Sequence, residues 1–388
     1  MKIALISSGS GSRGGGEIYL RFLAQGLAAA GHEVVALVPD APRMDELADS
    51  LTENASVHRF AFHTTYDRRL RGLGAWLDRR QQGQLATLFA GLDVDVLHVN
   101  QQVAEDGLDL VLAAAASGRA WVSTIHVGHS AAALGARFGA GRDWASARVL
   151  ARAGGDYIAV SATSKAQLAT RFPQARVHTV LNGVPTPDRA ALAAARAQAR
   201  ADWDLKDHEI AVGAVGRIEA QKAPLALVDH LATVGPEHPV RLVWIGDGSL
   251  RTELENHARA HRDWMPLTID GWRTDAALRL AGLDVFAMPS VFEGLPLALL
   301  EAMHAGLPVV ATRADGIAEA VTPGESGFLC SGSEDWKAAL TTLLENPDLR
   351  ASMGQKAQAR ALAQFSTDAM ATGTARIYQQ AIERKVTT

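Results

Sequence analysis

Short apolar runs recur along this chain, and each is separated from the next by a longer, alanine-rich stretch with helical spacing. The runs lack the polar residue at every second position that a half-exposed strand carries. They therefore predict parallel strands whose two faces are both covered by helices. The strand candidates are residues 2–7, 33–38, 94–99, 121–126, 157–160 and 177–181, and then residues 210–215, 241–245, 267–269, 285–288 and 308–311. The predicted fold class is α/β, with two doubly wound parallel sheets.

Residues 182–187 mark the expected boundary between the two sheets, because their two prolines and one glycine end regular structure. A chain of 388 residues also exceeds one ordinary hydrophobic core. We predict two Rossmann-like domains, residues 1–183 and residues 184–366. The final helical pattern, within residues 367–388, has no strand after it, and we expect it to pack back on the first domain.

The overall composition is that of a globular protein in a reducing compartment. The formal net charge of -4 gives no indication of nucleic-acid binding. Cys330 is the only cysteine, which excludes an intramolecular disulfide and a cysteine-based zinc site. No apolar run reaches the roughly 18 residues that a membrane span needs, and the N-terminal run is too short for a signal peptide. These features predict a cytoplasmic location.

Residues 7–19 follow the first apolar run and contain Gly9, Gly11 and Gly14 in the spacing of the dinucleotide-binding fingerprint. A glycine loop between a strand and a helix exposes backbone N–H groups that suit any phosphate. Asp40, after the second run, is placed to bind ribose hydroxyls as in nicotinamide enzymes. Asp40 lies farther along the chain from the glycine loop than the usual ~20 residues. The loop by itself does not choose between a nicotinamide and another phosphate ligand.

The most informative segment, residues 271–321, places two glutamates around the start of a helix. Glu293 comes just before the expected helix, whose first position suits Pro296, and Glu301 lies in its second turn. With a rise of about 1.5 Å per helical residue, the two carboxylates are expected roughly 10 Å apart. The amides of Gly294 to Leu297 lie between them, at the positive end of the helix dipole. This arrangement suits a nucleotide sugar, which has hydroxyl groups at both ends and a diphosphate in the middle.

Two cationic residues follow the strand expected at 210–215. Arg217 and Lys222 lie at the carboxyl end of that strand, where open parallel sheets bind ligands. A guanidinium and an ammonium group stabilise a departing diphosphate without a metal ion. The next strand leads to Gly246, where a backbone can approach a ligand closely. Asp93 and Asp95 match a metal-binding Asp-x-Asp motif. They lie at the entry to their strand, on the wrong side of the sheet for catalysis, so we expect no metal.

These segments together resemble the retaining GT-B glycosyltransferases of family 4, a large group of bacterial polysaccharide, lipopolysaccharide and glycolipid transferases. The motifs that carry the resemblance are Gly14-Gly15-Gly16-Glu17, Ser123-Thr-Ile-His126, Asn182-Gly-Val184, Gly216-Arg217 with Lys222, Gly246-Asp-Gly248, and Glu293-Gly-Leu-Pro296 through Glu301. The last motif is highly specific in its strand, loop and helix setting. The resemblance covers nearly the whole chain, and it implies an acceptor domain and a donor domain that face each other across a cleft.

The resemblance also implies a role for each motif residue. Arg217 and Lys222 are expected to bind the diphosphate, Glu301 the ribose hydroxyls, and Glu293 the donor sugar. The expected catalytic residues are Glu293, His126, Arg217 and Lys222, with His126 near the donor sugar. The expected donor-binding set also contains Gly15 and Gly16 from the N-terminal domain, together with Gly246, Trp272, Arg273, Gly294, Leu295, Pro296 and Leu297.

The activity that the resemblance implies is transfer of a hexose from a UDP- or GDP-linked donor to a hydroxyl of a saccharide, lipid-linked or small-molecule acceptor. Retention at the anomeric carbon and independence of metals and cofactors are part of this expectation. Two other classes remain open at this point, a nicotinamide-dependent oxidoreductase and a nucleotide-sugar epimerase on the same architecture.

Arginines and apolar residues alternate in two segments of the N-terminal half. The first contains Arg68, Arg69, Arg71, Arg79 and Arg80 together with Leu70, Leu73, Trp76 and Leu77, and its acidic residues are Asp67 and Asp78. The second contains Arg137, Arg142, Arg148 and Arg152, with Asp143 as the acidic residue beside them. Basic residues, leucines and a tryptophan are typical of an interfacial helix. We therefore predict peripheral contact with the anionic inner face of a membrane or with a lipid diphosphate acceptor; a solvated helix face is the alternative.

Overall fold

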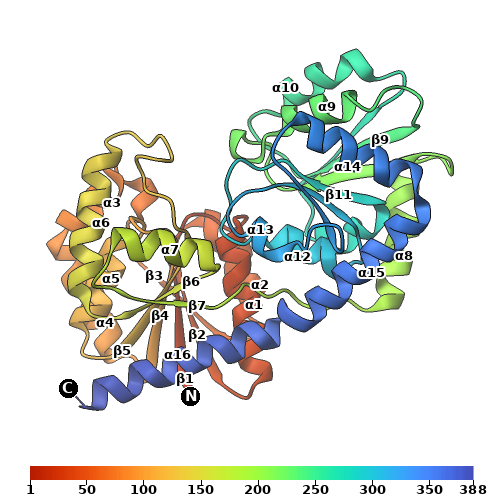
Figure 1. Ribbon diagram of the computed structural model, residues 1–388. Coiled ribbons are helices and arrows are strands. Elements are labelled where there is room, and N and C mark those ends of the chain that lie inside the picture. The colour runs from red at the N-terminus through yellow and green to blue at the C-terminus, as the bar shows by residue number, and fades with distance from the viewer. Residues whose placement is uncertain (388) are drawn as a thin grey trace. The chain divides into compact units, whose positions relative to one another are not determined.

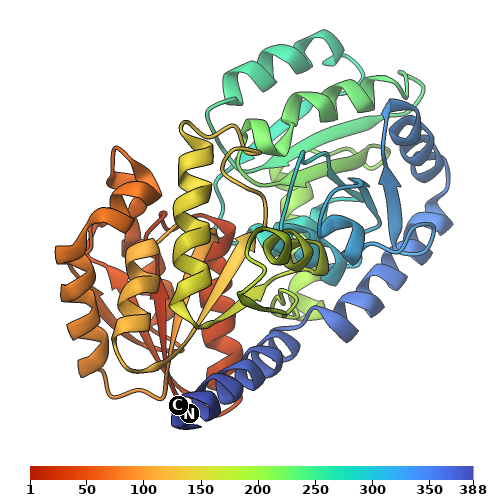
Figure 2. The ribbon, with the colours of Figure 1, turned by 60° about the vertical axis from the view of Figure 1, so that its left-hand side comes forward.

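The computed structural model describes residues 1–387 and divides into two compact units. The first consists of residues 1–183 together with the helix that begins at Thr367, and the second consists of residues 184–366. Each unit is a parallel sheet with helices on its faces (Figures 1 and 2). The predicted fold class, α/β with two Rossmann-like doubly wound sheets, is therefore confirmed.

The first unit has a seven-stranded sheet in the order β3-β2-β1-β4-β5-β6-β7. Its strands are β1 (Lys2–Ser7), β2 (Glu33–Pro39), β3 (Ser56–Phe60), β4 (Val96–Val103), β5 (Ala120–Val127), β6 (Asp156–Ala159) and β7 (Arg176–Thr179). Its helices are α1 (Gly15–Ala29), α2 (Asp45–Leu51), α3 (Arg71–Leu77), α4 (Arg79–Gly91), α5 (Leu108–Ala116), α6 (Gly139–Ala153) and α7 (Ala162–Arg171). The strand order reverses between β1 and β4, and the carboxyl ends of those two strands therefore form the switch point at which such sheets bind ligands.

The second unit has a six-stranded sheet in the order β10-β9-β8-β11-β12-β13. Its strands are β8 (Ile210–Val215), β9 (Val240–Ile245), β10 (Leu267–Gly271), β11 (Val285–Met288), β12 (Val309–Thr312) and β13 (Gly327–Cys330). The helices are α8 (Arg189–Asp202), α9 (Pro224–Ala232), α10 (Arg251–Ala258), α11 (Ala276–Arg279), α12 (Leu297–His304), α13 (Ile317–Ala320), α14 (Ser333–Glu345) and α15 (Pro347–Gln364). Here the order reverses between β8 and β11, which places the switch point beside the segments that contain Arg217 and Glu293.

The central strands are apolar because both faces of each sheet are covered. All but the first residue of β1 are buried, and β9 buries Trp244 with 1% of its surface exposed. The last helix, α16 (Thr367–Thr387), packs on α1 and β5 of the first unit, and both views show it lying against that sheet (Figures 1 and 2). Its buried Tyr378 hydroxyl forms a 2.5 Å hydrogen bond with Nδ1 of His98 on β4. Among residues 1–387, no helix is long and apolar enough to cross a membrane.

Candidate functional site

Two loops leave the sheet of the second unit side by side, at the carboxyl ends of β8 and β11. The first contains Arg217 and the short 3-10 helix Ala220–Lys222, and the second contains residues 289–296. Val291 N–H donates to the carbonyl of Gln221 over 2.9 Å, and the Gln221 side-chain amide donates to the carbonyl of Phe292 over 3.1 Å. These hydrogen bonds fix the two loops to each other at the switch point.

The same contact brings together two predicted site residues, Lys222 and Glu293. Lys222 Nζ lies 2.5 Å from Glu293 Oε1, and the two side chains are 17% and 9% exposed. The aliphatic part of Lys222 lies over Gly216, where a Cβ atom would come within 3.1 Å of the lysine Cε. A largely buried ion pair therefore stands where the diphosphate and the donor sugar were expected.

Arg217 differs from Lys222 in its surroundings. Its side chain is exposed and forms no hydrogen bond or ion pair within residues 1–387. The backbone beside it is fixed, because Trp244 Nε1–H donates to the carbonyl of Gly216 over 2.8 Å and Ile218 N–H donates to the carbonyl of Asp247 over 2.9 Å. An unpaired guanidinium on a fixed backbone is available to bind an anion.

Close packing of two backbones accounts for the glycine at position 246. Gly246 has a φ of 145°, and a Cβ atom there would lie 2.1 Å from the carbonyl oxygen of Gly216. A Cβ atom at Gly248 would lie 2.4 Å from the carbonyl oxygen of Ile218. Both glycines are needed to let the loops after β8 and β9 touch, so neither needs a ligand to explain it. A donor contact at Gly246 stays a prediction.

The loop before α12 is held from its other side by residues after β12. Glu293 N–H donates to Oδ2 of Asp315 over 3.1 Å. A Cβ atom at Gly316 would lie 1.8 Å from the carbonyl oxygen of Gly294, so this approach also requires glycine. These contacts explain how the chain holds Glu293 at the end of the sheet.

Helix α12 begins at Leu297, one residue later than predicted, with Pro296 as its N-cap. Because proline has no N–H group, the backbone donors between Gly294 and Leu297 are those of residues 294, 295 and 297. Glu301 lies in the second turn, as expected, and is partly exposed. Trp272 and Arg273 follow β10 at the edge of the sheet, where Arg273 pairs with Asp275 over 3.0 Å. Their contact with a base stays a prediction.

In the first unit, the glycine loop binds a carboxylate of its own chain. The fully buried Glu17, in the first turn of α1, accepts from Ser10 Oγ and from Gln102 Nε2, the latter over 3.0 Å. Burial nevertheless raises its pKa above the ordinary value.

The Glu17 carboxylate lies inside the glycine loop, where a Cβ atom at Gly14 would come within 2.6 Å of its Oε2. A carboxylate in this place disfavours a bound phosphate, which argues against the nicotinamide alternative. Gly15 remains open, because no atom lies within 4 Å of the position of its Cβ. At Gly16 a Cβ atom would lie 2.1 Å from Gln102 Nε2, so glycine there makes room for that side chain.

His126 lies near the carboxyl end of β5 and is 8% exposed. Asn100, which the sequence analysis did not single out, fixes its tautomer. The Asn100 amide donates to the carbonyl of Gly16 over 3.0 Å, so its Oδ1 must accept from His126 Nε2–H over 2.8 Å. Burial lowers the His126 pKa to about 3. The imidazole is therefore neutral at physiological pH, and its Nδ1 can accept a hydrogen bond from a hydroxyl group.

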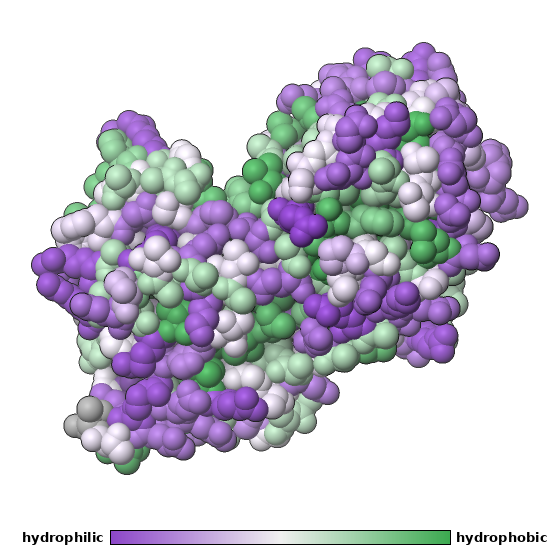
Figure 3. Space-filling model, viewed as in Figure 1, coloured by the Kyte–Doolittle hydropathy of each residue, from purple (hydrophilic) through white to green (hydrophobic). Residues whose placement is uncertain are grey.

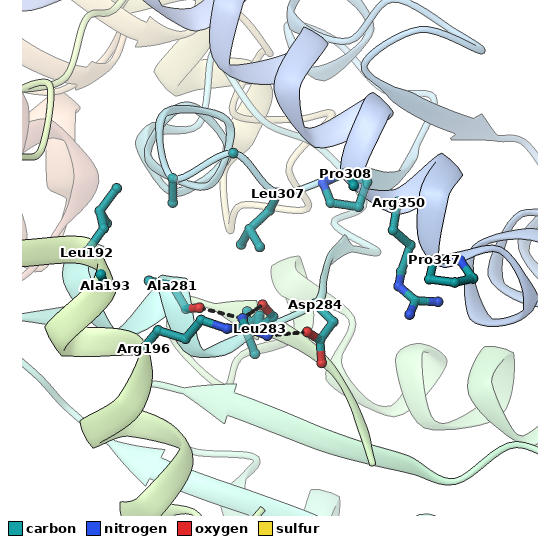
Figure 4. A pocket seen from close by; sticks show the side chains of 13 residues that line it. Leu192, Ala193, Arg196, Ala281, Leu283, Asp284, Leu307, Pro308, Pro347 and Arg350 are labelled. Atoms are coloured by element: carbon teal, nitrogen blue, oxygen red, sulfur yellow. Dashed lines mark hydrogen bonds and ion pairs between the residues drawn. The ribbon is translucent and has the colours of Figure 1, made fainter. Parts of the chain in front are cut away.

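A cavity of about 410 Å³ in the second unit lies away from these residues (Figure 4). Its lining includes Leu307 and Pro308, which precede β12, and Asp284, which precedes β11. Arg196 from α8 spans this lining and pairs with Asp284 over 2.7 Å. The cavity thus lies at the amino ends of the strands, opposite the edge that carries Arg217 and Glu293.

No group of His, Cys, Asp or Glu side chains within residues 1–387 has the arrangement of a metal site. Asp93 and Asp95, which match a metal-binding motif in sequence, lie before β4 and bind the first strand instead. Lys2 N–H donates to Asp95 over 2.7 Å, and Lys2 Nζ pairs with Asp93 over 3.1 Å.

Comparisons with known proteins assign the chain to a family. A family described as Glycosyltransferase Family 4 matches residues 13–187, and one described as Glycosyl transferases group 1 matches residues 209–346. A GDP-mannose-dependent alpha-mannosyltransferase of Mycobacterium tuberculosis is 30% identical over 314 residues, which cover 78% of this chain and 76% of the relative. The chain belongs to glycosyltransferase family 4. The resemblance seen in the motifs is thereby confirmed.

Other family 4 relatives match over shorter segments. A D-inositol 3-phosphate glycosyltransferase of Corynebacterium kroppenstedtii is 31% identical over 205 residues, which cover 48% of this chain and 44% of the relative. The chain spans less than half the length of several curated relatives that it matches, between 22% and 44% of them. Among solved structures, Anabaena HepE in complex with UDP and glucose has a TM-score of 0.77 at 22% identity and covers 98% of this chain and 100% of its own. That likeness confirms the GT-B fold.

Proposed function

We propose that this family 4 member transfers a glycosyl group from a nucleoside diphosphate sugar to a hydroxyl group of a saccharide, lipid-linked or small-molecule acceptor. We further propose that it retains the anomeric configuration and needs no metal ion. The observation that carries the proposal is the unpaired Arg217 beside the Lys222–Glu293 ion pair, at the switch point of the second sheet.

The cationic groups of this site match a departing diphosphate. Arg217 offers a forked guanidinium that has no hydrogen bond or ion pair within residues 1–387, and Lys222 offers an ammonium group that a diphosphate can draw from Glu293. The N-terminus of α12 adds the positive end of its dipole. Together these groups stabilise the negative charge that develops as the leaving group departs.

The two glutamates suit the hydroxyl groups at either end of the donor. When Lys222 turns to the diphosphate, Glu293 loses its partner and can accept hydrogen bonds from the donor sugar. Glu301, one turn into α12, is proposed to bind the ribose hydroxyls. From the first unit, neutral His126 is proposed to accept from a sugar or acceptor hydroxyl through Nδ1.

The proposed reaction proceeds on one face of the donor sugar. The bond between the anomeric carbon and the diphosphate oxygen breaks, and the acceptor oxygen bonds to the anomeric carbon on the same face. The acceptor proton passes to an oxygen of the departing diphosphate. No protein group must protonate the leaving group, since a diphosphate is stable as an anion. This is consistent with a neutral His126 whose one N–H proton is held by Asn100.

Ligand-induced changes in melting temperature test the donor class. The panel contains UDP, GDP, their glucose and mannose conjugates, and NAD, because the relatives named above act with GDP-mannose or bind UDP and glucose. We expect stabilisation by one nucleoside diphosphate and its sugar conjugate, lost in Arg217→Ala and kept in Arg262→Ala, an exposed arginine of the same unit before β10. Stabilisation by NAD alone would contradict the proposal.

A further inference from the structure

Helices α3 and α6 lie side by side at one end of the first unit (Figure 1). The rings of Trp76 on α3 and Trp144 on α6 meet edge to face, with their centroids 5.4 Å apart. Gly72 anchors α3 from beneath, because a Cβ atom there would lie 2.5 Å from the carbonyl oxygen of Glu105. The two helices therefore present one continuous surface, which we call the α3–α6 face.

Large apolar side chains project from the α3–α6 face. The exposed fractions are 48% for Leu70, 61% for Leu77, 63% for Phe138 and 55% for Trp144, and these are four of the eight large hydrophobic residues that are exposed within residues 1–387. Figure 3 shows hydrophobic surface beside a hydrophilic tip at this end of the unit. Phe138 also has a φ of 57°, a left-handed conformation that is costly for an aromatic residue. The fold thus holds an aromatic ring outward at some cost in backbone strain.

The acidic side chains near this face each have an arginine partner. Asp78 pairs with Arg68 over 3.0 Å and Asp143 pairs with Arg171 over 2.8 Å, while Glu105 pairs with Arg142. In these segments, the arginines without an ion pair within residues 1–387 are Arg69 and Arg71 at the start of α3, Arg79 and Arg80 at the adjoining start of α4, and Arg137, Arg148 and Arg152 in and just before α6. The face is therefore positively charged, although the chain as a whole has a formal net charge of -4.

Apolar and cationic groups alternate closely on the α3–α6 face. The Arg137 guanidinium lies 5.1 Å from the centroid of the Phe138 ring, and the Arg148 guanidinium lies 5.7 Å from the Trp144 ring. Each ring therefore has an unpaired cation beside it. Aromatic rings with a cationic neighbour favour the level of lipid headgroups, where the rings meet acyl chains and the cations meet phosphates.

We propose that the α3–α6 face docks on the surface of an anionic membrane. In this arrangement Phe138 and Trp144 enter the headgroup layer, and the unpaired arginines contact lipid phosphates. A nucleic acid would satisfy the arginines but not the aliphatic Leu70 and Leu77, which cannot stack on bases and need hydrocarbon. The proposal concerns a surface of the first unit and does not depend on the donor, so it can fail or hold independently of the proposed transferase activity.

Vesicle co-sedimentation of the full-length protein tests the proposal without any sugar nucleotide. One set of vesicles contains phosphatidylcholine alone, and the other contains equal parts of phosphatidylcholine and phosphatidylglycerol. The charge variant is Arg69→Glu, Arg80→Glu and Arg148→Glu together. Its control carries the same change in charge on exposed arginines of the second unit, Arg189→Glu, Arg259→Glu and Arg262→Glu.

We expect sedimentation with the anionic vesicles only, weakening as salt rises through the physiological range because surface charges are screened. The charge variant should lose at least about a hundredfold in affinity, since each of the three arginines near an anionic surface contributes roughly a fivefold factor and the new glutamates add repulsion. The control should bind as the unaltered protein does. Phe138→Asn, which suits the left-handed backbone, should also weaken binding while leaving the melting temperature unchanged or higher.

Three results would overturn the proposal: no sedimentation with anionic vesicles, equal losses in the charge variant and its control, or binding that ignores lipid charge and salt. Binding to vesicles that a short DNA duplex abolishes at an equal phosphate concentration would assign the face to nucleic acid instead.

Discussion

The Lys222–Glu293 ion pair fixes the loop after β8 to the loop after β11, so breaking it should loosen both loops. Replacing Lys222 by Met removes the ammonium group 2.5 Å from Glu293 Oε1 and leaves a carboxylate that is 9% exposed without its partner. Removing one partner costs about 3–5 kcal/mol for fully buried pairs and ~0–1 kcal/mol for exposed ones. With side chains 17% and 9% exposed, we expect about 2–3 kcal/mol, toward the buried end of that range.

Hydrogen exchange at the amide of Val291 measures this loss locally, because that amide donates to Gln221 in the same loop contact. A loss of about 2–3 kcal/mol corresponds to exchange that is about 30 to 150 times faster. Glu293→Gln should cost less, since its amide oxygen still accepts from Lys222. The double variant should lose less free energy of local opening than the two single variants together, because two neutral groups then face each other.

The amide of Ala211 is the internal control, because it donates to Asp284 at the opposite, amino edge of the sheet over 2.9 Å. Its exchange should not change in any of the variants. Unchanged protection of Val291 in Lys222→Met, or strictly additive losses in the double variant, would refute the reasoning.

Four further predictions concern the site. Arg217→Ala should lose one or two charge-assisted hydrogen bonds to the diphosphate, each worth about 1.5–3 kcal/mol, and so lower turnover at least about tenfold with an unchanged melting temperature. Normal turnover would show that Arg217 does not bind the diphosphate. Glu301→Ala should weaken calorimetric binding of free nucleoside diphosphate, whereas Glu293→Ala should mainly lower turnover with the intact donor; equal effects would contradict the separate roles. Turnover should survive dialysis against chelator, and recovery only with magnesium or manganese would overturn metal independence. The His126 pKa of about 3 in the folded state lies below its usual 6.5, so the free energy of unfolding should fall as pH drops through that interval. Between pH 7 and pH 5, urea unfolding should show a loss about 2 kcal/mol larger in the unaltered protein than in His126→Gln. Equal losses would contradict a buried neutral imidazole.

The sequence predicted the central strands well because they are buried on both faces. β8 contains no polar side chain, and β9 has Arg241 as its one charged residue, so both have the apolar pattern of strands covered on two faces. The edge strands β3 and β13 were missed. β3 is mostly exposed and polar, and β13 has the sequence Gly-Phe-Leu-Cys, without the Val and Ile residues that marked the other short strands. β4 was predicted to end at residue 99 but continues through polar residues to Val103, because its ladder with β5 continues past the apolar run.

The motifs named the candidate site residues, whose roles stay predictions, but they did not indicate the contacts of these residues. Lys222 and Glu293 stand 71 positions apart, and nothing local indicates that they form an ion pair. Asn100 fixes the His126 tautomer from a neighbouring strand, and its only signal in the sequence is its place just after an apolar run. The glycine fingerprint predicted a phosphate loop, but the carboxylate of Glu17, three residues after Gly14, lies in that loop and accepts a hydrogen bond from Ser10 Oγ.

Release of nucleoside diphosphate as a function of added acceptor tests the central claim most directly. The purified protein is incubated with the sugar nucleotide that stabilises it best, with and without a panel of saccharide and lipid-linked alcohols, and the free nucleoside diphosphate is quantified by chromatography. We predict release that depends on one acceptor class, is stoichiometric with the glycosylated acceptor, and is at least about tenfold slower in Arg217→Ala. Conversion of the donor to an epimer without release, or turnover of NAD in place of the sugar nucleotide, would contradict the assignment of glycosyl transfer to this site.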